Sequence, residues 1–224
     1  MNRAATTVFV LLLCVLLAAL LVWAMWDLPA APVALAETVS ASMAQSGVDH
    51  PVTGVLLNFR GYDTLLEVGV LLLAFLGMLA CGATPDQRTA LPPDPLLEAL
   101  ARLLVPLMVL VAGYLLWAGA FRPGGAFQAA AVLAAAGVLL RLAGPVTAWT
   151  HPGRWLRVAL VAGFVVFLGV AALGLGFGML LEYPQGWAGS LILLVESALT
   201  ISLGLLLAGL FLAGPEMPPR GPGS

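Results

Sequence analysis

The chain has 224 residues, of which 62% are hydrophobic and only 9% are charged, and all nine of its basic residues are arginines. A soluble domain of this size carries about 25% charged residues, so this composition is that of an integral membrane protein. The net charge of −2 gives no reason to expect nucleic-acid binding, and Cys14 and Cys81 suit neither a metal site nor a disulfide framework.

Six apolar runs approach or exceed the length of about 20 residues that crosses a bilayer, which predicts an all-α, polytopic membrane helix bundle. They cover residues 7–26, 64–81, 96–120, 127–142, 155–180 and 187–213. The first run precedes Ala34-Leu35-Ala36, which resembles a signal-peptide cleavage site. Because the run is longer than the roughly 7–15 residues of a signal-peptide core, we interpret it as a retained helix.

The connector between the first two runs contains an apolar segment, 52–60, that is too short to span a membrane. Such a segment lies flat in the interface or re-enters the membrane beside other protein, and the sequence leaves both alternatives open.

The densest polar stretch of the chain, 58–67, follows directly and leads into the second apolar run. Arg60, Asp63 and Glu67 are spaced to lie on one face of a helix, so we expect Arg60 to pair with Asp63. Asp63 together with Thr64 could cap the helix, and Gly61 would let the chain turn into it. The interpretation of this stretch as a helix start therefore competes with an ion-path role for its carboxylates.

Two carboxylates fall inside predicted spanning helices. Glu67 lies about one turn into the second run, and Glu196 lies about 13 Å into the last run, near the middle of a hydrocarbon core of roughly 30 Å. An uncompensated charge at the core centre costs about 2.5–3.5 kcal/mol or more, so such residues are candidates for a proton or cation path. The alternative is a protonated Glu196 that bonds to a neighbouring helix.

Two proline- and glycine-containing segments punctuate the second half of the chain. Residues 85–95 form a Pro-rich linker, and Pro106 falls inside the third run, where it is expected to kink the helix. Pro123, Gly124 and Gly125 form a turn suited to close backbone packing against a partner, and Gln128 could offer a polar group to a hydrated cavity.

These boundaries divide the chain into a two-helix domain at 1–84, the linker at 85–95, a four-helix domain at 96–213 and a disordered tail at 214–224. Arginine placement orients the bundle with both termini in the cytoplasm, because the outer side keeps only Arg60 and Arg122. The inner side collects the others, namely Arg3, Arg88, Arg102, Arg141, Arg154, Arg157 and Arg220.

The sequence carries no phosphate-binding glycine loop, no metal-ligand cluster and no nucleophile–base constellation. We therefore expect neither an enzyme nor a cofactor or metal site. Paired intramembrane charges are also scarce for a complete transporter, which indicates one part of a larger assembly.

Two motifs in order resemble one known family. Residues 52–67, Val-Thr-Gly-Val-Leu-Leu-Asn-Phe-Arg-Gly-Tyr-Asp-Thr-Leu-Leu-Glu, resemble the small domain at the C-terminal end of the A subunit of Mrp-type multisubunit cation/proton antiporters. A counterpart occurs as a separate small subunit in membrane-bound hydrogenases. The second half resembles the B subunit of the same antiporters, on 102–106 (Arg-Leu-Leu-Val-Pro), Tyr114, 123–128 (Pro-Gly-Gly-Ala-Phe-Gln) and Glu196. The chain would thus fuse two pieces that are usually separate.

The resemblance implies a multi-pass subunit of a prokaryotic cell membrane complex that exchanges Na⁺ for H⁺ and is related to respiratory complex I. Its implied partners are the other membrane subunits, and Glu67 and Glu196, with Asp63 and Gln128, would contribute to the ion path. The alternatives are an ion-pumping membrane subunit of a hydrogenase-like or other redox complex, a non-conducting scaffold, and a stand-alone transporter.

Overall fold

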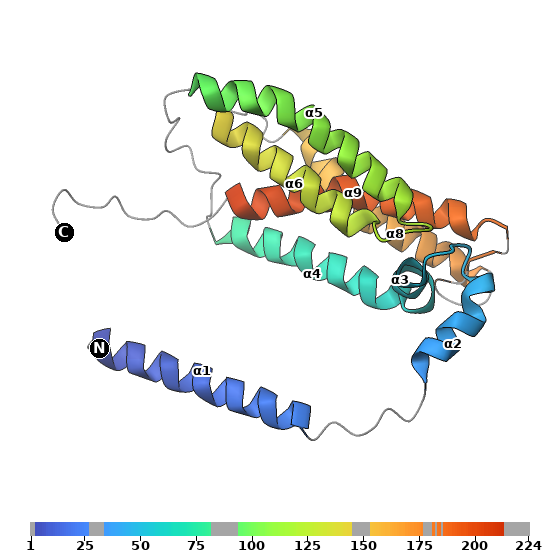
Figure 1. The fold of residues 1–224 in the computed structure, drawn as a ribbon, viewed down its shortest axis with the longest axis horizontal. Coiled ribbons are helices and arrows are strands. Elements are labelled where there is room, and N and C mark those ends of the chain that lie inside the picture. Colours follow the sequence, from blue (N-terminus) through green and yellow to red (C-terminus); the bar gives the residue numbers. More distant parts are fainter. Residues whose placement is uncertain are drawn as a thin grey trace. The chain divides into compact units, whose positions relative to one another are not determined.

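The computed structural model describes residues 3–26, 34–81, 94–144, 153–176, 181, 183–184 and 186–212. Within these ranges there is no strand, and six helices are long and apolar enough to cross a membrane. This confirms the predicted all-α membrane bundle. The six are α1 Arg3–Trp26, α4 Gly61–Ala80, α5 Pro95–Ala118, α6 Ala126–Ala143, α8 Arg154–Leu175 and α9 Ala188–Leu212 (Figure 1).

The described helices form two compact units, residues 1–38 and residues 39–224, which we call the N-terminal unit and the main unit. The N-terminal unit holds α1, whose span from Thr6 to Trp26 contains no charged side chain. Residues 85–93 of the predicted linker and the predicted tail at 214–224 lie outside the described residues.

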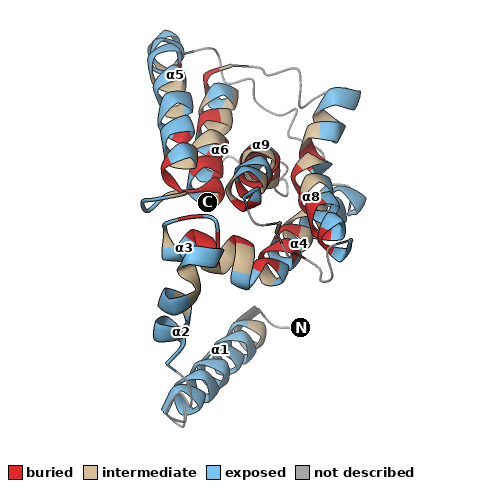
Figure 2. Ribbon diagram, turned by 90° about the vertical axis from the view of Figure 1, so that its right-hand side faces the viewer, coloured by how far each residue is buried: buried red, intermediate tan, exposed pale blue. Residues whose placement is uncertain are grey.

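Helix α9 is the centre of the main unit. It packs chiefly against α6 on one side and α8 on the other, and Figure 2 shows its buried residues between them. Large apolar side chains of α9 are almost fully buried, among them Ile192, Val195, Leu199, Leu203 and Leu206. The facing side of α6 is rich in alanine, and small side chains let two membrane helices approach closely.

The α8–α9 contact depends on Gly163. A Cβ added at Gly163 would lie 2.7 Å from the Cβ of Ser202 and 3.1 Å from the carbonyl oxygen of Ala198. Beside it, the hydroxyl of Ser202 donates a hydrogen bond to the carbonyl oxygen of Leu160. The two helices therefore touch at backbone level, as glycine allows in membrane packing.

Helix α4 packs on α8 and α9, so it belongs to the main unit. Its first residue, Gly61, is buried, and a Cβ there would lie 3.4 Å from a methyl group of Leu181. The predicted ion pair between Arg60 and Asp63 is present. The predicted capping by Asp63 and Thr64 is wrong, because Arg60 is the N-cap residue and no side chain caps the helix. Thr64 lies within the helix and donates to the carbonyl oxygen of Leu56 at 2.7 Å.

The short segment before α4 is irregular and helical. It consists of α2 Leu35–Ser42, a 3₁₀ turn at Met43–Gln45, α3 Pro51–Gly54 and one π-helical stretch at Val55–Phe59. The predicted segment 52–60 is thus helical, and it packs on protein rather than standing free.

Hydrogen bonds hold this segment to the turn after α5. The backbone N–H groups of Asp49 and His50 both donate to the carbonyl oxygen of Ala120 at 2.9 Å. The buried hydroxyl of Thr53 donates to the carbonyl oxygen of Gly119 at 2.5 Å. These bonds satisfy carbonyl groups that the end of α5 leaves without helical partners.

A further bond holds the segment from the other side. The hydroxyl of Tyr183, which lies between α8 and α9, donates to the carbonyl oxygen of Leu57 at 2.7 Å. Burial raises the pKa of Tyr183 to about 12, so the hydroxyl stays protonated and able to donate at physiological pH. The segment from Pro51 to Phe59 is therefore bonded both to the turn after α5 and to the connection between α8 and α9.

Replacing Gly163 by Ala should lower stability by about 1–3 kcal/mol, because the added methyl meets Ser202 and the α9 backbone. Gly169→Ala on the same helix is the matched control, since a Cβ there has no atom within 4 Å and alanine favours helix. The measurement is the temperature at which half of the purified protein leaves the monodisperse peak in detergent. Equal temperatures for the two variants would contradict the close α8–α9 contact.

Replacing Thr53 by Val should loosen the segment from Pro51 to Phe59, because the near-isosteric side chain cannot donate to Gly119, at a cost of about 1–3 kcal/mol. Hydrogen–deuterium exchange of the amides at 49–60 should accelerate in Thr53→Val and stay unchanged in Thr53→Ser, which keeps the hydroxyl. Unchanged exchange in both variants would show that this bond does not hold the segment.

Candidate functional site

Glu196 lies on α9, at the centre of the main unit, and is 3% exposed. It is the one charged residue among the buried side chains of the described part of the chain. Its position is eight residues past Ala188, so it lies about 12 Å from the start of the helix. Glu196 thus lies inside the last of the helices that could span a membrane.

The turn between α5 and α6 brings backbone to the carboxylate of Glu196. Gly125, the N-cap residue of α6, has a φ of 106°, a conformation that favours glycine. Its N–H donates to the carbonyl oxygen of Leu115 at 2.8 Å, and a Cβ on Gly124 would lie 2.5 Å from that same oxygen. The turn after Pro123 therefore packs closely on the end of α5, as the sequence predicts for this motif, with α5 of the same chain as its partner.

The carboxylate of Glu196 lies at the N-terminus of α6. Its Oε1 accepts a hydrogen bond from the N–H of Ala126 at 3.3 Å. A Cβ on Gly125 would lie only 2.8 Å from this oxygen, and one on Gly119 would lie 3.3 Å away. Glycine at these two positions leaves the room the carboxylate occupies. The N-terminal N–H groups and dipole of α6 favour a negative charge at this place.

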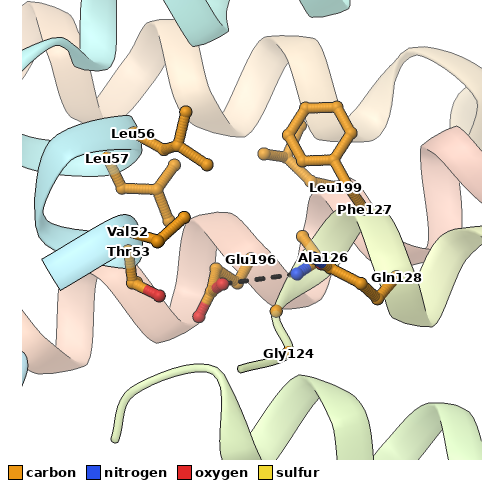
Figure 3. A pocket seen from close by; sticks show the side chains of 11 residues that line it. Val52, Thr53, Leu56, Leu57, Gly124, Ala126, Phe127, Gln128, Glu196 and Leu199 are labelled. Carbon is orange, nitrogen blue, oxygen red and sulfur yellow. Dashed lines mark hydrogen bonds between the residues drawn. The ribbon is translucent and has the colours of Figure 1, made fainter. Parts of the chain in front are cut away.

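A cavity of about 20 Å³ adjoins Glu196, which is room for about one water molecule. Figure 3 shows the side chains around it, contributed by the segment from Pro51 to Phe59, by α6 and by α9. Gln128 is among the residues that line this cavity. The complete lining is Val52, Thr53, Leu56, Leu57, Gly124, Gly125, Ala126, Phe127, Gln128, Glu196 and Leu199.

Glu67 and Asp63 lie in a different place from Glu196. They line an open groove of about 660 Å³ on the surface of the main unit, with Arg60 and the side of α4. Glu67 is exposed there. The structure thus brings Arg60, Asp63 and Glu67 together on one face, as their spacing predicts, and it keeps Glu67 out of the cavity beside Glu196.

One side chain belongs to both sites. Phe127, at the start of α6, lines the cavity beside Glu196 and also the groove beside Glu67. Phe127 is thus the residue that the two sites have in common. Its place directly after the glycine turn is the sequence signal that could have singled it out.

Thr53 and Gly119 also belong to the site without having been expected there. Thr53 is a lone hydroxyl in an apolar segment, which is a readable sign of a buried hydrogen bond, whereas nothing in the sequence marks Gly119. Pro106 lies elsewhere: it lines an open groove of about 540 Å³ between α5 and α6, with the ion pair of Glu98 and Arg102. No group of three or more metal-ligating side chains occurs among the described residues.

Two solved structures share the fold. A chain of the membrane-bound sulfane sulfur reductase, an archaeal respiratory membrane complex, is 24% identical with a TM-score of 0.72, over 93% of this chain and 97% of that one. A chain of the Mrp complex from Dietzia sp. DQ12-45-1b is 24% identical with a TM-score of 0.71, over 100% of this chain and 27% of that one. This chain thus spans about a quarter of that Mrp chain.

No curated protein matches the sequence. A family model does, over residues 96–214, which is more than half of the chain and begins where the second predicted domain begins. Its description is a domain related to the MnhB subunit of Na⁺/H⁺ antiporter. With six helices able to span a membrane and a fold found in chains of multisubunit membrane complexes, this protein belongs to the family of domains related to the MnhB subunit of Na⁺/H⁺ antiporter.

Proposed function

We propose that this protein is a membrane subunit of a multisubunit monovalent cation/proton antiporter, in which it contributes Glu196 to the ion path and takes part in assembly. One observation carries the proposal: a buried carboxylate inside a spanning helix lies between a glycine turn and a cavity large enough for one water molecule. Family membership supports it independently.

The physical argument concerns the cost of a charge at this depth. A carboxylate inside the hydrocarbon region costs about 2.5–3.5 kcal/mol or more when nothing compensates it. Glu196 receives one long backbone hydrogen bond and the field of the α6 N-terminus, which offsets part of that cost. A bound proton or cation would offset the rest, and that is the property an ion-path residue needs.

The other candidates take supporting roles in this proposal. Gln128 offers a polar group to the water-sized cavity, and Phe127 lines both that cavity and the groove that holds Asp63 and Glu67. Arg60, Gly61 and the turn of Pro123, Gly124 and Gly125 have structural roles.

The orientation and domain division belong to the same proposal. Arg60 and Arg122 lie at the end of the main unit where α4 begins and α5 ends, whereas Arg102 and Arg154 lie near the starts of α5 and α8. This separation supports cytoplasmic termini in a prokaryotic inner membrane. The division near 85–95 would mark two joined sequence families, although α4 packs into the same unit as the second part.

A second function is an ion-pumping membrane subunit of a redox-driven complex. The observation in its favour is the match over nearly the whole length of a chain from an archaeal respiratory membrane complex. In both functions the chain moves ions and performs no chemical conversion itself. Mild-detergent purification of the tagged chain distinguishes them, because co-purifying iron–sulfur subunits favour the redox complex and large antiporter-like subunits alone favour the antiporter.

Replacing Glu196 by Gln should reduce Na⁺/H⁺ exchange at least about tenfold while the complex still assembles, because the amide keeps the shape but cannot bind and release a proton. The measurement is the Na⁺-induced collapse of a pH gradient in inverted membrane vesicles from a host without its own antiporters. Glu98→Gln, at an exposed carboxylate on α5, is the matched control and should exchange normally. Normal exchange by an assembled Glu196→Gln complex would support the non-conducting scaffold instead.

A further inference from the structure

The exposed face of α4 presents a carboxylate where a membrane helix would face lipid. Helix α4 has 20 residues and is about 30 Å long, the thickness of a hydrocarbon core. Glu67 lies six residues past Gly61, so its backbone is about 9 Å inside the end of the helix. Its side chain is exposed on the main unit rather than turned into the bundle.

Nothing in the described part of the main unit neutralises Glu67. The nearest arginine in the groove, Arg60, is paired with Asp63. No ion pair of Glu67 occurs among the described residues, which include ion pairs for Asp63 and Glu98. Helix α1 carries no charged side chain from Thr6 to Trp26.

The surface around Glu67 has the form of a helix-docking site. Leu66, Val70 and Leu73 are 51%, 64% and 68% exposed and continue the stripe of Glu67 along α4. Further along, Gly77 is exposed, and a Cβ there would meet no atom within 4 Å. A stripe that ends in small residues lets a second helix approach closely.

We infer that this α4 face docks a transmembrane helix of another subunit, and that the helix carries a lysine or arginine opposite Glu67. Charge decides the identity of the occupant. Lipid chains would leave the carboxylate without a partner, whereas a basic side chain in a protein interface compensates it and fixes the register of the two helices. The groove of about 660 Å³ beside Glu67, walled by Leu71 and Phe127, is the space that the basic side chain would enter.

This inference rests on the proposed membership of a multisubunit complex, but it does not require Glu196 to carry ions. The docking inference and the ion-path role of Glu196 can therefore be disproved separately. Loss of transport in an assembled complex reports on Glu196, and loss of a subunit from the complex reports on the α4 face.

The first test is co-purification of the tagged, full-length chain from membranes in which the whole complex is produced. Glu67→Lys should lower the yield of one partner subunit at least about tenfold, because it places like charges together at the interface. Glu67→Gln should lower it less. Glu98→Lys reverses the charge of another exposed carboxylate of the main unit and should leave the yield unchanged. Wild-type yields for Glu67→Lys would overturn the inference.

The second test needs no destabilising change. A photo-reactive amino acid at Val70 in the otherwise natural complex should cross-link to one helix of that same subunit, and this helix should contain a lysine or arginine. Changing that residue to glutamate should restore the yield of Glu67→Lys. Cross-links to lipid alone, or to a helix without a basic residue, would overturn the inference.

Discussion

The hydrogen bond from the N–H of Ala126 to Glu196 is the contact on which the arrangement of the main unit depends. It joins the first half of the central helix, α9, to the first residue of α6. For that bond to form, the chain between α5 and α6 must pass within van der Waals distance of a carboxylate. Only residues without a side chain allow this at Gly119 and Gly125, and only a positive φ at Gly125 turns the chain into α6. The turn, the cavity and Phe127 all lie next to this contact.

The segment from Pro51 to Phe59 packs against the same part of the main unit and is held there by hydrogen bonds. Its Thr53 and the preceding Asp49 and His50 donate to the carbonyl groups that end α5, and the carbonyl oxygen of Leu57 accepts from the hydroxyl of Tyr183. Backbone polar groups at membrane depth require such partners, because lipid supplies none. The irregular segment thus covers the part of the bundle where helix continuity is broken, and with Thr53 it forms one wall of the cavity beside Glu196.

Much of this fold follows from the sequence, since the apolar runs fix the number of helices and their approximate limits. The depth of Glu196 and the pairing of Arg60 with Asp63 follow from helical spacing. The capping of α4 was predicted wrongly because the helix begins at Gly61, so Asp63 and Thr64 lie inside it, and the π-helical stretch that sets this start is not revealed by sequence patterns. The hydrogen-bond partner of Glu196 could not be predicted from the sequence either. Ala126 lies 70 residues away and contributes a backbone N–H that any residue type except proline could provide.

The position of Glu196 along α9 determines what fraction of the transmembrane potential lies between it and each side of the membrane. The helix has 25 residues, and Glu196 lies about a third of the way from the end at which α5 passes into α6. An elementary charge that crosses the whole membrane gains or loses about 2.3 kcal/mol per 100 mV, so one that travels from that side to Glu196 experiences about 0.8 kcal/mol of it in a uniform field. In the proposed ion path, the occupancy of this carboxylate would then depend on membrane voltage as well as on ion concentration, and the side from which it is filled would determine the sign of that dependence.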